Sequence, residues 1–192
     1  MTGTQKRKVD KKEDEAAIPD VVAKPPPEES FFSKIRPEKA KLHTFNPKSG
    51  KWDTRCITVK MDNIPFARGA LRLCYYCWLD ESPVTGKPFK KDCGKEKHIF
   101  VAKLSIDPLE ERATYFTDVQ VQMYSRMIAE KFNAYDPPKK IEFLRAWLLE
   151  LVERPSSPMY GLEKFIFGPY RKHNNNCKTQ QNFIHFINTI IF

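Results

Sequence analysis

Three segments of this chain alternate apolar and polar residues, and this alternation constrains the fold more than any other feature. The segments are residues 55–61, 69–79 and 98–106. A period of two places one set of side chains on each face of a β-strand, so each segment predicts a strand with one buried face. The apolar faces comprise Ile57, Val59 and Met61; Leu71, Leu73, Tyr75, Cys77 and Leu79; and Phe100, Ala102, Leu104 and Ile106.

The pattern changes after an Asp-Pro pair. Apolar residues then recur at three- and four-residue spacing, which predicts an amphipathic helix ending near Asn133. Its apolar positions are Phe116, Val119, Met123 and Met127. Residues 141–152 fit either a helix or a strand, and residues 159–167 predict one more extended segment. Strands, one helix and further strands, without β-α-β repetition, indicate an α+β domain.

Composition divides the chain into two parts. Residues 1–40 mix charged residues with a Lys-Pro-Pro-Pro-Glu-Glu run, so we expect a disordered arm there and a folded domain over residues 41–192. Phe31, Phe32 and Ile35 form an apolar cluster in the arm, which either docks a partner or packs onto the domain.

The basic charge belongs to the domain rather than to the arm. The formal net charge is +9, and residues 41–192 carry 24 Lys and Arg against 16 Asp and Glu. This excess favours anionic partners such as phosphates, with a generic basic surface as the alternative.

Three features of the sequence indicate the cytoplasm. The chain has no uncharged apolar run of about eighteen residues. Its charged N-terminus shows no secretory signal. The five cysteines are odd in number and irregularly spaced, which indicates reduced thiols.

Two segments could bind phosphate, although the sequence contains neither a Walker A motif nor GxGxxG. Residues 64–72 predict a tight turn with Gly69, and with Arg68 and Arg72 placed to meet an anion; an ordinary hairpin has the same pattern. Lys103 lies in mid-strand, like the strand lysine that holds the α- and β-phosphates in nucleotide kinases. A lysine that protects an edge strand from aggregation is the alternative.

Possible metal ligands give no recognisable site. Cys74 and Cys77 have zinc-knuckle spacing, but residues three apart on a strand point to opposite faces. His173, Cys177 and His185 are only three candidates, and their spacing matches no common zinc site.

Nine short segments occur in one order along residues 42–186. They are 45–52 (FNPKSGKW), 65–72 (PFARGALR), 101–103 (VAK), 132–133 (FN), 137–139 (PPK), 150–155 (ELVERP), 162–166 (LEKFI), the trio Gly168, Tyr170 and Lys172, and 174–176 (NNN). As a set they resemble the alpha-kinase family, the atypical protein serine/threonine kinases that include elongation-factor-2 kinase and the myosin heavy chain kinases.

The resemblance implies an alpha-kinase N-terminal lobe, with a curved antiparallel sheet and one main helix, and a truncated C-terminal lobe. It implies that residues 65–72 form a phosphate loop, that Lys103 is the nucleotide lysine and that Arg72 supports the phosphates. Glu163 and Phe165 would form the hinge that meets the adenine. The implied activity is transfer of the γ-phosphate of magnesium-ATP to Ser or Thr of a protein, such as elongation factor 2 or a myosin heavy chain. Neither a membrane nor a nucleic acid is the expected partner.

The resemblance also favours a strand for residues 141–152, and the chain departs from the family in two places. Tyr124 occupies the helix position where several members have a glutamate that holds the lysine. The sequence stops at Phe192, before the family's Asp-Leu-Gln-Gly loop and zinc module, so the catalytic residues stay unassigned. His185 matches the family's first zinc ligand, but its partners are missing. We therefore expect no bound zinc and no measurable kinase activity from these 192 residues alone.

Two other functional classes stay open at this point. One is a nucleotide-binding or regulatory fragment without catalysis. The other is a basic nucleic-acid-binding module, for which aromatic residues beside basic ones, as in residues 170–172, are typical.

Overall fold

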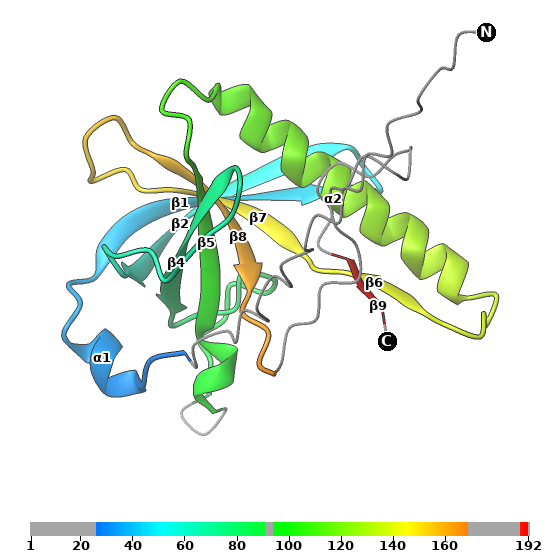
Figure 1. Cartoon of the computed structure of the whole chain (residues 1–192), viewed down its shortest axis with the longest axis horizontal. Helices are drawn as coiled ribbons and strands as arrows, with labels where there is room; N and C mark the ends of the chain where they lie inside the picture. Colours follow the sequence, from blue (N-terminus) through cyan, green and yellow to red (C-terminus); the bar gives the residue numbers. More distant parts are fainter. Residues whose placement is uncertain (1–25, 91–93, 169–188, 192) are drawn as a thin grey trace, which may run out of the picture.

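The chain forms a strand-rich body crossed by one long helix (Figure 1). The computed structural model describes residues 26–90, 94–168 and 189–191. The elements in chain order are α1 (Glu29–Ser33), β1 (Glu38–Asn46), β2 (Lys51–Met61), β3 (Ala67–Arg68), β4 (Arg72–Leu79), the 3₁₀ turn η1 (Lys95–Lys97), β5 (Ile99–Ser105), α2 (Arg112–Asn133), β6 (Ile141–Phe143), β7 (Ala146–Glu150), β8 (Met159–Lys164) and β9 (Thr189–Ile191).

Six of the strands close into a ring. The main antiparallel sheet has the order β2-β1-β7-β8-β5-β4-β3, and an additional pairing joins β2 to β4. Because that pairing connects the two ends of a six-strand run, the sheet has an enclosed interior and an outer face. β6 and β9 pair in a separate two-stranded sheet. The expected α+β fold, with a curved antiparallel sheet and one main helix, is confirmed.

Apolar side chains from all six ring strands fill the interior. They are Ala40, Leu42, Ile57, Val59, Met61, Cys77, Leu79, Phe100, Ala102, Trp147, Leu149, Leu151, Tyr160 and Leu162. These residues alternate along each strand, which confirms the apolar face predicted for β2 and most of the faces predicted for β4 and β5. The predicted burial of Leu71 is wrong, because Leu71 precedes β4 and is 51% exposed. Cys77 is fully buried in the interior, whereas Cys74 lies on the outer face beside Lys103, so the two thiols point away from each other.

Helix α2 packs on the outer face of the sheet. A second apolar cluster lies beneath it, formed by Phe45, Tyr115, Val119, Met123, Ala146, Leu148 and Met159. The predicted end of the helix near Asn133 is confirmed. The Asn133 amide donates to the Ile141 carbonyl at 2.7 Å and accepts the Ile141 N–H at 3.0 Å, which ties the end of α2 to β6.

The folded part begins earlier than expected. Residues 29–40, which we had assigned to a disordered arm, contain α1 and the first residues of β1. Phe32 is 1% exposed and its ring packs against Trp78 at 5.1 Å, so this end of the apolar cluster packs onto the domain. The physical reason is that one buried aromatic side chain stabilises a short segment that is otherwise polar. Residues 1–25 lie outside the described part, and the disorder expected there stays a prediction.

Strand β1 was missed in the sequence, and residues 141–152 prove to be extended. β1 sends Ala40 and Leu42 into the interior but also buries His43 and Phe45 under α2, so its two faces do not alternate in polarity. β6 and β7 confirm strand rather than helix for this segment, but they form two short strands in different sheets instead of the one strand that the resemblance favoured for residues 141–152.

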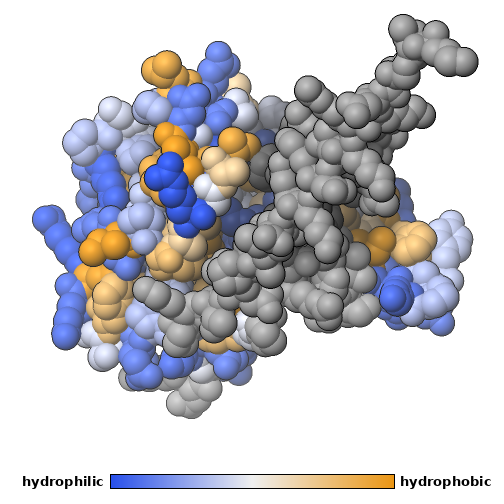
Figure 2. Space-filling view, viewed as in Figure 1, coloured by the Kyte–Doolittle hydropathy of each residue, from blue (hydrophilic) through white to orange (hydrophobic). Residues whose placement is uncertain are grey.

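The exposed hydrophobic side chains are dispersed. On the face shown in Figure 2, hydrophobic residues lie singly or in small groups among hydrophilic ones. Ile64 precedes β3, Leu109 precedes α2 and Ile128 lies on α2, and each is more than half exposed. Separate exposed side chains of this kind are normal for a folded domain. None of the described helices is long and apolar enough to cross a membrane.

Candidate nucleotide-binding site

An ion pair on the outer face joins two strands of the ring. The Lys103 ammonium on β5 lies 2.6 Å from Oε2 of Glu163 on β8. Their side chains are 23% and 8% exposed, so the lysine reaches solvent and the carboxylate is buried. An ammonium group has three donors. Lys103 can therefore hold Glu163 and an external anion at the same time.

Gln122 connects this ion pair to α2. Its amide donates to Oε1 of Glu163 at 3.0 Å and to the Leu144 carbonyl at 3.1 Å. Tyr124 does not take this position. Its ring lies edge-on against Phe45 at 5.3 Å, and its match to the family's glutamate position stays a prediction. Helical spacing explains why Gln122 makes the contact, because residues 119, 122 and 123 share the face turned to the sheet.

Arg72 lies on the same outer face but turns toward α2. Arg72 pairs with Ser105 in the β4–β5 register, two residues along from the pair Cys74 and Lys103. Its guanidinium donates to Glu110 at 3.1 Å and to Asp118 at 2.7 Å. The hydrogen bond from Arg72 is the main cause of a lowered pKa at Glu110. The phosphate role of Arg72 stays a prediction, and the contacts show that Arg72 also holds α2 to the sheet.

The predicted tight turn between two strands is present. β3 pairs with β4, with Ala67 opposite Cys74 and Arg68 opposite Leu73. The Gly69 N–H donates to the Arg72 carbonyl at 2.9 Å. Arg68 and Gly69 are exposed at this turn. Cys74 also pairs with Lys103, so β4 is the strand that lies between β3 and the lysine on β5.

Phe165 directly follows the C-terminal end of β8 and lies in an aromatic cluster. It is 8% exposed and its ring lies 5.7 Å from that of Tyr76, which in turn stacks on Phe66 at 3.9 Å. The Phe165 N–H donates to the Ile99 carbonyl at 3.2 Å. The structure thus brings Lys103 and Glu163 together, whereas the Phe165 side chain serves packing and its hinge role stays a prediction.

The described residues offer no group for a metal ion. Within residues 26–90, 94–168 and 189–191, no three His, Cys, Asp or Glu side chains come together as ligands. His173, Cys177 and His185 lie outside the described residues.

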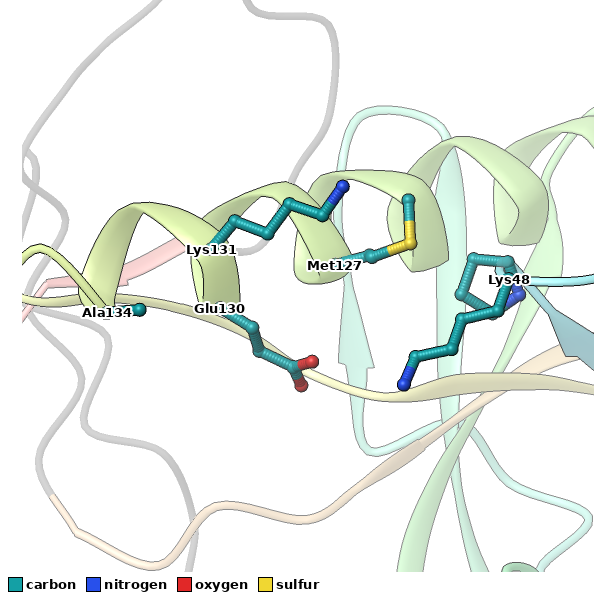
Figure 3. Close-up of a pocket in the computed structure, with 6 residues that line it drawn as sticks. Lys48, Met127, Glu130, Lys131 and Ala134 are labelled. Atoms are coloured by element: carbon teal, nitrogen blue, oxygen red, sulfur yellow. The ribbon is translucent and has the colours of Figure 1, made fainter.

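A separate groove lies between the β1–β2 turn and the C-terminal half of α2 (Figure 3). Its volume is about 630 Å³, and it is lined by Pro47, Lys48, Met127, Glu130, Lys131 and Ala134. In Figure 3 the Lys48 and Glu130 side chains extend toward each other across the opening. None of the predicted site residues lines this groove, so it is distinct from the Lys103 site.

Comparison with known proteins identifies the class to which this fold and site belong. The sequence profile described as the alpha-kinase family matches residues 67–189, which include Arg72, Lys103 and Glu163. The chain belongs to the alpha-kinase family.

Individual relatives agree with this assignment. Alpha-protein kinase 1 of Dictyostelium discoideum is 41% identical over 160 residues, covering 78% of this chain and 11% of that protein. Eukaryotic elongation factor 2 kinase of Mus musculus is 32% identical over 167 residues, covering 82% of this chain and 22% of the relative. The chain therefore spans between a tenth and a quarter of the length of these curated relatives.

Solved structures show the same fold. The inactive alpha-kinase domain of myosin heavy chain kinase A in complex with ATP has a TM-score of 0.61 and 32% identity, covering 73% of this chain and 66% of that one. The same domain in complex with AMP-PNP has a TM-score of 0.62 and 31% identity, covering 74% of this chain and 66% of that one. Those domains bind ATP and an ATP analogue.

Proposed function

We propose that this chain forms the ATP-binding part of an alpha-type protein serine/threonine kinase, and that Lys103 is its principal contact to the phosphates. The observation that carries the proposal is the Lys103–Glu163 ion pair at 2.6 Å, on the outer face of the ring and linked by Gln122 to α2. ATP complexes of a related alpha-kinase domain support the choice of ligand.

The roles of the residues follow from their contacts. Lys103 offers its ammonium to phosphate oxygens, and Glu163 fixes the direction of that ammonium through a charge-assisted hydrogen bond. Gln122 holds the second oxygen of Glu163, so the position of α2 is coupled to the position of the lysine. Arg72 adds positive charge two residues along the β4–β5 register. Phosphoryl transfer depends mostly on such positioning and charge stabilisation.

The proposed reaction is transfer of the γ-phosphate of ATP to a Ser or Thr hydroxyl of a protein. In kinases, magnesium neutralises the phosphate charge when bound. We propose a protein as the acceptor because relatives are named as kinases of elongation factor 2 and of myosin heavy chain. A Ser or Thr hydroxyl is the acceptor group that the resemblance to the alpha-kinase family implies. We place the activity in the cytoplasm, because the five cysteines are odd in number and irregularly spaced, which is typical of reduced thiols.

Calorimetric titration with ATP tests the phosphate contact. Lys103→Ala should weaken ATP binding about 10- to 150-fold, since a charge-assisted hydrogen bond contributes about 1.5–3 kcal/mol. Lys60→Ala is the matched control. Lys60 lies on β2 opposite Trp78, so this substitution removes the same charge at a position away from the site. Equal ATP affinity in Lys103→Ala and in the unmodified chain would overturn the proposal.

A further inference from the structure

Gly161 lies on β8 between two strands whose residues carry side chains on the outer face of the sheet. It lies in the middle of β8, and its register partners are Lys103 on β5 and Leu148 on β7. Its neighbours on the outer face of β8, Met159 and Glu163, are 3% and 6% exposed, while Gly161 itself is partly exposed. The outer face of the sheet therefore has an opening at this residue.

Nothing among the described residues requires glycine here. Gly161 does not have a positive φ, so an L-residue could adopt its backbone conformation. A Cβ atom built at Gly161 would meet no heavy atom of residues 26–90, 94–168 or 189–191 within 4 Å. Glycine inside a strand weakens it, and often marks a place where a ligand approaches the backbone closely. Neither backbone strain nor crowding explains why residue 161 is glycine. A ligand that lies close to the backbone would explain it.

The opening is bounded by the groups of the nucleotide site. The Lys103 side chain leaves the sheet from the same face, directly across the β5–β8 register from Gly161. Glu163 is two residues further along β8, so its side chain points to this face as well. The chemistry that suits a space beside a lysine ammonium is an anionic group.

We propose that the phosphates of the bound nucleotide lie over Gly161, and that the missing side chain at this position determines whether ATP can reach Lys103. The inference rests on the proposed function and deepens it, because it assigns a specificity-determining residue in the same site. A side chain at position 161 would project into the space that the phosphates occupy, whereas the ion pair between Lys103 and Glu163 would be retained.

The experiment compares Gly161→Ala and Gly161→Val with the unmodified chain, using titration with ATP, titration with adenosine and thermal unfolding. We expect ATP to bind about threefold more weakly to the alanine variant and at least tenfold more weakly to the valine variant, with a smaller loss for adenosine. The unfolding temperature should not fall, since the added Cβ has room and valine favours strands. Cys56→Val, at an exposed position on β2, is the matched control for adding a β-branched residue.

The possible results separate this inference from the proposed function. If the unmodified chain binds no ATP, the proposed function fails and this inference fails with it. If the unmodified chain binds ATP and both Gly161 variants bind it within twofold, only the inference about Gly161 is overturned. Equal losses for ATP and adenosine would place the base over Gly161 and overturn the phosphate assignment. Should Gly161→Val not fold, Gly161→Ala alone decides by the same criteria.

Discussion

At the scale of single residues, two buried carboxylates organise the outer face of the sheet. Glu163 holds Lys103 and Gln122 in the proposed site. Glu150 is the centre of a second group of charged and polar side chains, near the start of α2. Arg112 donates to it at 2.6 Å, and His43 lies 3.4 Å away. Buried carboxylates are stable when they are paired in this way, and each removal of a partner leaves an unsatisfied charge.

The second group predicts how stability depends on pH. Burial lowers the pKa of His43 below its model-compound value of 6.5, and the positive charges of Lys41 and Arg112 act in the same direction, against the opposing effect of Glu150. The unfolded chain therefore binds a proton at higher pH than the folded chain does. The free energy of unfolding should fall as the pH drops below about 6.5.

Urea unfolding between pH 8 and pH 3 measures this effect. His43→Phe should flatten the pH dependence below about 6.5. His98→Phe is the control. In this variant the free energy of unfolding should still show the pH dependence that is due to His43. A further loss is expected below pH 4.5, because Arg112 and Lys41 lower the pKa of Glu150 despite its burial. Identical slopes in His43→Phe and the unmodified chain would show that His43 does not titrate with folding.

At the scale of secondary-structure elements, polar contacts fix α2 on the sheet at several points along its length. Arg112 reaches Glu150, Arg72 reaches Asp118, and Gln122 reaches Glu163. The apolar cluster beneath α2 supplies the burial, and these contacts determine the register of the helix against the strands.

Arg72 should consequently contribute to stability as well as to binding. Arg72→Ala removes hydrogen bonds to Glu110 and Asp118, and we expect a loss of about 1–2 kcal/mol in the free energy of unfolding. It should also weaken ATP more than adenosine, because the guanidinium offers charge to phosphates. Arg68→Ala, in the same turn but exposed, should change stability by less than about 0.5 kcal/mol. Unfolding in urea and titration with both ligands distinguish the two roles: unchanged stability would contradict the anchoring role, and equal losses for ATP and adenosine would contradict the phosphate role.

Helix α1 gives a prediction with a control in the adjacent residue. Phe32 is 1% exposed against Trp78, whereas Phe31 is 37% exposed. Phe32→Ala should cost about 3–5 kcal/mol of stability, as truncation of a buried phenylalanine usually does, and Phe31→Ala should cost far less. The midpoints of thermal unfolding provide the comparison. Equal effects of the two substitutions would mean that α1 does not dock as described.

The elements that could be predicted from the sequence are those with one covered face. β2 buries only its inner side chains. β4 and β5 leave outer residues such as Arg72, Cys74 and Lys103 partly exposed, so their alternation is visible, although β4 also buries Tyr76 and Trp78 on the outer side. β1 was missed because α2 covers His43 and Phe45 on its outer side. For the same reason, residues 141–152 stayed ambiguous until the family resemblance was considered, since β7 is buried on both faces.

The site, like the strands, could be predicted from the sequence only in part. Lys103 could be proposed from its mid-strand position, and Glu163 from the family resemblance. Their contact depends on the register of β5 against β8, which are 60 residues apart in the chain. Gln122 was missed, although a polar residue on the apolar face of the predicted helix is a signal that could have identified it.

At the scale of the whole molecule, the ring of strands and α2 act as one support for the nucleotide. The closed sheet fixes β5 beside β8, and α2 fixes the carboxylate that orients the lysine. The central claim is that ATP phosphates bind at Lys103 on this support.

The most direct test of that claim is affinity labelling with an acyl phosphate derivative of ATP, which transfers its acyl group to an amine beside the bound phosphates. The 192-residue chain is incubated with the reagent, and the modified lysines are identified by mass spectrometry. The structure predicts acylation of Lys103, suppressed by an excess of ATP. Labelling of other lysines that ATP suppresses, with Lys103 unmodified, would contradict it.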